Sequence, residues 1–257
     1  MDTDNPEPFL LEGSSAGVLL LHGFTSTPQS VRYVGHRLHE LSGATVLAPL
    51  LAGHGTTPEA FAKTGFRDWL GSAEEALKTL KARCKTVCIA GLSLGGTIAL
   101  NLSIRRTELV DSVATINGST GLYSSSQMMA FFDGCSDAYS LGIGSDIQHP
   151  GRREICYDRI PNTTLQERYV LATATGQILP LLEKPLLIMQ SRVDHVVSPE
   201  NGKKIERSVA SKSILFRWLE NSFHVATLDN DRDLIACELA TFVSSGELID
   251  GDLSNCL

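Results

Sequence analysis

The stretch that most constrains this chain is residues 91–95, GLSLG, which lies between two segments of different pattern. The run before it, 86–90, is β-branched and apolar and predicts a strand, whereas the small and apolar residues of 96–103 predict a helix. A G-x-S-x-G motif in this context forms a sharp turn that exposes its serine. The flanking glycines leave room where strand and helix pass closely. The motif therefore predicts a reactive Ser93 at the edge of a sheet.

The rest of the chain alternates short apolar runs with helical patterns. The predicted strands are 18–21, 44–48, 86–90, 110–116, 185–189 and 214–219. The predicted helices are 28–41, 68–84, 96–106, a helix containing 205–209, and 234–243. Strands that are apolar throughout are typical of parallel sheets buried on both faces. We therefore expect an α/β fold with a doubly wound, mainly parallel sheet.

One segment, 119–182, breaks this alternation. It contains Ser- and Gly-rich turns, an apolar run at 128–132 and weak helical patterns, without a convincing strand. Compact domains rarely use so long a bare connection, so we expect a single domain, 1–257, with a small cap inserted at 119–182. The alternative is a partly disordered surface loop. The run at 128–132 favours the cap, since disordered segments are poor in such residues.

Charge and composition exclude several classes of protein. The net charge is −7 and the basic residues are scattered, which argues against a nucleic-acid partner and against an electrostatic membrane anchor. The acidic start lacks the features of a signal peptide, and no stretch approaches a membrane span, so we expect no membrane insertion and a cytoplasmic location. The six cysteines form no C-x-x-C pair or metal-ligand spacing, which predicts reduced, buried thiols: Cys84, Cys88, Cys135, Cys156, Cys237 and Cys256.

A serine hydroxyl needs a base within hydrogen-bond reach and an acid that orients this base. Asp194 directly follows the predicted strand 185–189, and His224 follows the predicted strand 214–219. The carboxyl ends of parallel strands meet at one edge of the sheet, where Ser93 also lies. The chain order nucleophile, acid, base is the one that this kind of turn requires. The sequence therefore predicts Ser93, Asp194 and His224 as a catalytic triad.

Other residues at the strand ends fit these roles less well. His195 adjoins Asp194, and the side chains of neighbouring residues at a strand end point apart, so it is a poor base for this acid. Asn117 follows the predicted strand 110–116 but cannot replace a carboxylate. Asp229 and Asp231 resemble capping residues of the closing helix.

Acyl chemistry also needs donors for a developing oxyanion. One donor is expected to be the backbone N–H of Leu94, the residue after the nucleophile. The other is expected in the loop after the strand 18–21, where Gly23 allows a turn and the N–H of Phe24 is placed to donate. The alternative for this loop is an ordinary exit from a strand.

Several runs resemble one family. HGFTSTP at 22–28, LAGHGTTP at 51–58 and GLSLGG at 91–96 resemble the α/β-hydrolase superfamily. Within it, GIGSDI at 142–147, QSRVDHVV at 190–197 and WLENSFHVATLDND at 218–231 are most similar to bacterial monoacylglycerol lipases and small thermostable carboxylesterases. The similarity extends from about Gly17 to the closing helix.

The resemblance implies hydrolysis of single-chain esters such as monoacylglycerols, with a small lipid or ester as substrate and no cofactor or metal. It implies substrate contacts by Ile143 and by Glu154, which matches a cap glutamate that binds glycerol hydroxyls. The alternative for Glu154 is a solvated charge beside Arg152 and Arg153. A general carboxylesterase and a non-catalytic relative are the alternative functions. An exposed apolar face of the cap would fit a lipid surface or a second subunit, and the sequence favours neither.

Overall fold

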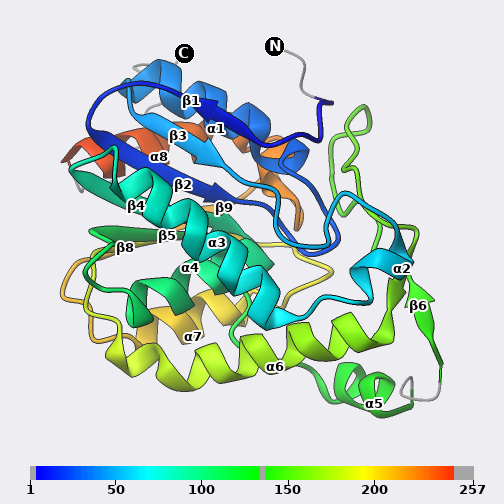
Figure 1. Cartoon of the computed structure of the whole chain (residues 1–257). Coiled ribbons are helices and arrows are strands. Elements are labelled where there is room, and N and C mark those ends of the chain that lie inside the picture. The colour runs from blue at the N-terminus through cyan, green and yellow to red at the C-terminus, as the bar shows by residue number, and fades with distance from the viewer. Residues whose placement is uncertain (1–3, 134–136, 246–257) are drawn as a thin grey trace.

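A mainly parallel sheet forms the centre of the molecule (Figure 1). The computed structural model describes residues 4–133 and 137–245. Within these residues the sheet has seven strands in the order β1-β3-β2-β4-β5-β8-β9, and only β1 is antiparallel to its neighbour. Their bounds are β1 Phe9–Leu11, β2 Ala16–Leu21, β3 Thr45–Ala48, β4 Thr86–Leu92, β5 Ser112–Ile116, β8 Leu186–Ser191 and β9 Ile214–Leu219.

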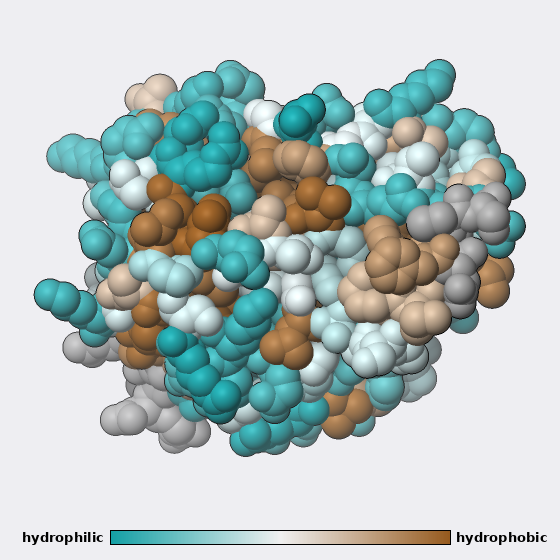
Figure 2. Space-filling model, turned by 90° about the horizontal axis from the view of Figure 1, so that it is seen from below, coloured by the Kyte–Doolittle hydropathy of each residue, from teal (hydrophilic) through white to brown (hydrophobic). Residues whose placement is uncertain are grey.

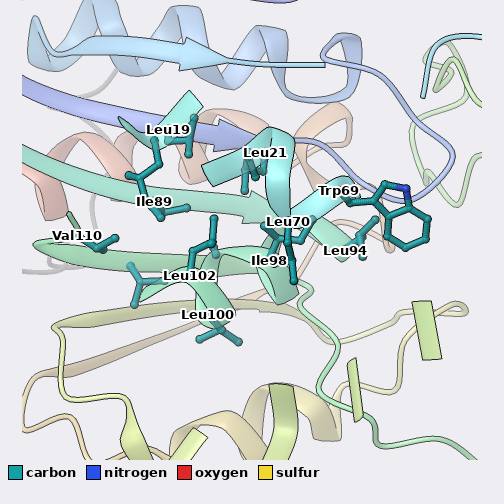
Figure 3. Packing of buried hydrophobic residues seen from close by; sticks show 14 of the residues in the cluster. Leu19, Leu21, Trp69, Leu70, Ile89, Leu94, Ile98, Leu100, Leu102 and Val110 are labelled. Atoms are coloured by element: carbon teal, nitrogen blue, oxygen red, sulfur yellow. The ribbon is translucent and has the colours of Figure 1, made fainter. Parts of the chain in front are cut away.

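Helices cover both faces of this sheet (Figure 1). Helices α1 (Gln29–Ser42) and α8 (Arg232–Ser245) lie on one face, and α3 (Phe66–Lys81), α4 (Leu94–Arg105) and α7 (Glu200–Ser208) on the other. Alternate residues of β2 point to opposite faces, so Val18 and Leu20 pack toward α1 while Leu19 and Leu21 pack toward α3 and α4 (Figure 3). This arrangement confirms the predicted α/β fold with a doubly wound sheet.

The segment 119–182 lies between β5 and β8. It contains α5 (Ser125–Asp133), β6 (Tyr139–Leu141), β7 (Arg159–Pro161), α6 (Asn162–Ile178) and a 3₁₀ turn, η2 (Leu179–Leu181). Strands β6 and β7 pair with each other, which corrects the expectation of no strand in this segment. Three-residue strands are too short to show an alternating pattern, which is why the sequence gives no signal for them.

The face that carries α5 and α6 shows separate apolar groups among hydrophilic residues (Figure 2). Met129 and Phe132 of α5 and Leu141 of β6 are exposed apolar side chains of this segment. The remaining short elements are α2 (Pro58–Phe61) and the 3₁₀ turn η3 (Ala226–Leu228). No helix within the described ranges is both long and apolar enough to cross a bilayer.

Other differences from the sequence analysis are local. The strand β1 was not predicted, because three residues beside an acidic, Pro-containing start carry no pattern. Cys84, Cys88 and Cys237 are buried, as predicted, and Cys84 and Cys88 are free thiols, whereas the free Cys156 is only half-buried. Burial raises the pKa of the Cys88 thiol to about 12. Cys135 and Cys256 lie outside the described residues.

Candidate active site

Ser93 occupies the turn between β4 and α4 in a strained conformation, with φ 53° and ψ −112°. A Cβ atom on Gly91 would overlap the backbone of Gly95, and one on Gly95 would overlap the carbonyl oxygen of Leu21. The backbone N–H of Ser93 donates to the carbonyl oxygen of Ile116 at 2.8 Å, which holds the turn against the end of β5. Both glycines are therefore required by the close packing that presents the Ser93 hydroxyl.

The structure brings Ser93, His224 and Asp194 into one hydrogen-bonded chain. His224 Nε2 lies 2.9 Å from Ser93 Oγ, and His224 Nδ1 lies 2.8 Å from Asp194 Oδ2. The Asp194 side chain is fully buried and that of His224 is 7% exposed. Because a carboxylate only accepts, Nδ1 carries the proton and the Nε2 lone pair faces the serine hydroxyl. This arrangement can remove a proton from Ser93.

Backbone groups hold the acid in place. Asp194 Oδ1 accepts the N–H groups of Val196 at 2.9 Å and Val197 at 2.7 Å, which leaves Oδ2 for His224. His195 points elsewhere: its Nδ1 lies 2.8 Å from Asp146 Oδ1, and its side chain is 59% exposed. The expectation that neighbouring side chains point apart at this strand end is met.

Asp146 is a residue of this site that the sequence analysis did not single out. Its Oδ2 accepts the backbone N–H groups of His224 and His195, each at 3.1 Å. Its carbonyl oxygen accepts the N–H of Val225 at 3.0 Å. The segment 119–182 thus binds the main chain on both sides of the His224 side chain. Only the run 142–147 of the resemblance gave a signal for it.

Asn117 holds the same loop from the side of the sheet. Its Nδ2 donates to the carbonyl oxygen of His224 at 2.7 Å and to Ser191 Oγ at 2.9 Å. Its Oδ1 accepts from Ser191 N at 2.7 Å and Gln190 Nε2 at 3.0 Å. Its backbone has φ 50°, which asparagine tolerates better than most residues. Asn117 therefore joins the ends of three strands through one buried amide.

The Asp229 carboxylate does not cap the closing helix α8, which corrects the expectation from the sequence. Its buried carboxylate accepts the N–H groups of Gln148 at 2.6 Å, His149 at 2.9 Å and Phe223 at 2.9 Å. Asp231 likewise directs its carboxylate to the backbone N–H of Asn221 at 2.8 Å. Both carboxylates accept backbone N–H groups of the loop that precedes His224. Patterns among neighbouring residues in the sequence could not identify these partners.

The loop of Phe24 lies beside Ser93, and the buried ring of His22 shapes it. His22 Nδ1 lies 2.9 Å from the carbonyl oxygen of Gly23, while Nε2 accepts the N–H of Leu51 at 3.1 Å. Burial lowers the pKa of His22 to about 4, so this ring is neutral at pH 7. Leu94 opens α4 directly after Ser93, and its side chain packs in the core (Figure 3).

A small cavity joins these groups. Its volume is about 20 Å³, and its walls include Phe24, Ser93, Ile143, Glu154 and His224. Both substrate-contact residues implied by the resemblance thus line the same cavity as the serine and the histidine. About 10–15 Å³ holds one water molecule, so the cavity is too small for an ester.

Glu154 lies in this cavity. The neighbouring Arg152 does not form an ion pair with Glu154, since it donates to the carbonyl oxygens of Leu228 and Asp229. Burial raises the pKa of Glu154 to about 7, although the nearby Ser26 hydroxyl and His224 oppose this shift. The residue is partly exposed, and its role as a substrate contact stays a prediction.

An α/β sheet with a strained serine, a histidine and an aspartate at its carboxyl edge is typical of serine hydrolases. The chain belongs to the alpha/beta hydrolase family, whose model matches residues 18–228. It is 38% identical over 229 residues to a thermostable monoacylglycerol lipase of Bacillus sp. (strain H-257), covering 89% of this chain and 90% of the relative. It is 29% identical over 244 residues to a carboxylesterase of Bacillus subtilis (strain 168), covering 95% and 98%.

Solved structures agree with these sequence relatives. A structure reported for the metagenome-derived lipolytic enzymes LipS and LipT superposes with a TM-score of 0.89 at 36% identity, covering 94% of this chain and 98% of the other. The resemblance drawn from the sequence motifs is therefore confirmed.

Proposed function

We propose that this chain, an ester-hydrolysing member of the alpha/beta hydrolase family, cleaves carboxylic esters of a single acyl chain through an acyl-enzyme on Ser93. The observation that carries this proposal is the hydrogen-bonded chain from Ser93 through His224 to Asp194. Monoacylglycerols are the proposed substrates, supported by the identity to a monoacylglycerol lipase.

In the first step, His224 Nε2 takes the Ser93 proton as the oxygen attacks the ester carbonyl. Asp194 stabilises the resulting imidazolium through Nδ1 and keeps the ring in one orientation. The backbone N–H groups of Phe24 and Leu94 donate to the oxyanion. His224 then gives its proton to the leaving alcohol. Water repeats the same sequence of proton transfers on the acyl-enzyme and releases the acid.

We assign Glu154 to the alcohol part of the substrate. Its carboxyl group shares the cavity with Ser93, and its pKa of about 7 leaves it able both to donate and to accept hydrogen bonds near neutral pH. Ile143 narrows the same cavity from the segment 119–182. We propose that this segment acts as a cap. Since the cavity holds only about 20 Å³, we expect the cap to move when an ester enters.

A general carboxylesterase is the second candidate, and the identity to the Bacillus subtilis carboxylesterase favours it. A hydrolysis panel separates the two: monoacylglycerols of several chain lengths, the matching diacylglycerols, methyl and nitrophenyl esters, an amide and a thioester. A strong preference for monoacylglycerols supports the lipase. Equal rates on small esters without a glycerol preference support the carboxylesterase.

Ser93→Ala tests the common mechanism. We expect kcat to fall by several orders of magnitude on every ester, with the folded state retained and labelling by a fluorophosphonate lost. Ser103→Ala is the matched control, because this buried serine of the same helix bonds only the carbonyl oxygen of Ala99. Undiminished hydrolysis by Ser93→Ala would exclude the proposed nucleophile.

A further inference from the structure

Arg168 on α6 is a buried cation without a partner. It is only 5% exposed, yet among the residues that the structure describes no carboxylate pairs with it and no oxygen accepts its N–H groups. The other buried arginine of the described residues, Arg32, donates to the carbonyl oxygens of Asn5 and Glu7. The two arginines are similarly buried, but of the two only Arg32 donates hydrogen bonds to oxygens of the described part of the protein.

The guanidinium of Arg168 lies near two aromatic rings at the candidate active site. Its central carbon is 5.6 Å from the ring centre of Phe24 and 5.7 Å from that of Tyr169. Phe24 carries one of the expected oxyanion donors, so this charge lies close to the reacting end of the cavity. The rings attract a cation, but they accept none of its five N–H donors.

Arg168 also lines a second, larger cavity. This cavity has a volume of about 380 Å³ and shares Arg168, Ile143 and Val196 with the cavity of Ser93. Its apolar wall is formed by Leu141, Ile143, Ile160, Leu165, Tyr169 and Val196. The junction of the two cavities is therefore a place where a short methylene chain leaving Ser93 would meet a cation.

The carboxylates nearby are already engaged. Asp146 lines the larger cavity but accepts hydrogen bonds from His195 and His224, and burial disfavours the charged form of Glu154 by raising its pKa. An unpaired buried charge is costly, and a planar guanidinium is best satisfied by a carboxylate that accepts two parallel N–H groups. A ligand can supply this carboxylate, whereas the described part of the chain does not.

We propose that Arg168 binds a carboxylate at the far end of the substrate's acyl group. The preferred acyl group is then that of a short dicarboxylic acid esterified at one end, with the free carboxylate at the junction of the two cavities. This assignment rests on the proposed ester hydrolysis at Ser93 and names the acyl class for the same site. It does not depend on which alcohol the ester contains.

The test compares monomethyl adipate with methyl hexanoate and dimethyl adipate, following acid release in a pH-stat. We expect the wild-type kcat/KM to be highest on monomethyl adipate. Arg168→Met should lower this value at least tenfold while changing methyl hexanoate less than threefold, as is typical for losing a hydrogen bond to a charged group. Arg168→Lys should retain an intermediate value. Arg207→Met is the matched control, since it removes the same charge from the exposed face of α7.

Equal losses on charged and neutral esters in Arg168→Met, or no wild-type preference, would overturn the proposal and leave Arg168 as a packing residue against Phe24. If Arg168→Met does not fold, inhibition of the wild type decides instead. Adipate should then inhibit hydrolysis of methyl hexanoate with a constant at least tenfold lower than that of hexanoate, and equal inhibition would overturn the proposal. A lack of Ser93-dependent hydrolysis of all three esters would instead reject the proposed function.

Discussion

The carboxylate of Asp146 accepts the backbone N–H of His224 at 3.1 Å, although the two residues are 78 positions apart. The same oxygen binds the N–H of His195, the residue after the proposed acid. One side chain of the segment 119–182 thus fixes the spacing between the two loops that carry Asp194 and His224. The proposed cap is therefore hydrogen-bonded directly to the loop that carries the proposed base.

Asp146→Ala should lower kcat by about 10–100-fold with little change in KM, because the His224 loop loses a hydrogen bond to a charged acceptor worth about 1.5–3 kcal/mol. His195→Ala is the matched control: it removes the imidazole but keeps the Asp146–His224 contact, and it should leave kcat nearly unchanged. Steady-state kinetics on a nitrophenyl ester, together with thermal melts, make the measurement. Equal effects in the two variants would show that Asp146 acts only through His195.

Glu154→Gln should stabilise the protein at alkaline pH. The folded-state pKa of Glu154 is raised from its ordinary 4.5 to about 7, so the charged form is disfavoured in the folded protein. This cost is absent below pH 4.5, grows as pH rises, and reaches at most about 3 kcal/mol above pH 7. Urea unfolding at pH 5 and pH 8 measures it. A stability difference between variant and wild type that is the same at both pH values would contradict the raised pKa.

The same substitution should change substrate selectivity. Glu154→Gln should lower kcat/KM on a monoacylglycerol by about tenfold or more, since one hydrogen bond between a charged group and a glycerol hydroxyl is weakened. Hydrolysis of a nitrophenyl ester, whose leaving group lacks those hydroxyls, should change little. Equal losses on both substrates would show that Glu154 does not bind the alcohol part of the substrate. Its effect would then lie in a step that all esters share.

Asn117→Ala should lower the free energy of unfolding by about 2–4 kcal/mol, because it leaves the backbone N–H of Ser191 and the amide of Gln190 without a partner. Asn117→Gly is the matched comparison. It loses the same hydrogen bonds but relieves the strain of φ 50°, so it should be about 1 kcal/mol more stable than Asn117→Ala. Chemical denaturation of the three proteins checks this order. An alanine variant as stable as wild type would contradict the role of the amide.

Much of the fold and of the candidate site follows from local patterns. The apolar strands and the motif around Ser93 depend on residues that are neighbours in sequence, so they could be predicted. Asp194 and His224 could be predicted too, since each directly follows a recognisable strand and parallel strands end at one edge. The three-residue strands β1, β6 and β7 could not, because so few residues show no periodicity.

What only the tertiary structure decided is how distant groups are paired. Asn117 binds the carbonyl oxygen of His224 across 107 positions, and the carboxylates of Asp146 and Asp229 bind backbone N–H groups of remote loops. In the sequence these residues are ordinary polar residues, and Arg168 is one more polar residue on a weakly patterned helix. The Arg168 side chain is buried at the cavity of Ser93, and no oxygen in the described part of the chain accepts its N–H groups. This position depends on the packing of α6 against the Phe24 loop. Local sequence specifies elements, whereas the partners of polar groups are set by the packing of elements far apart in the chain.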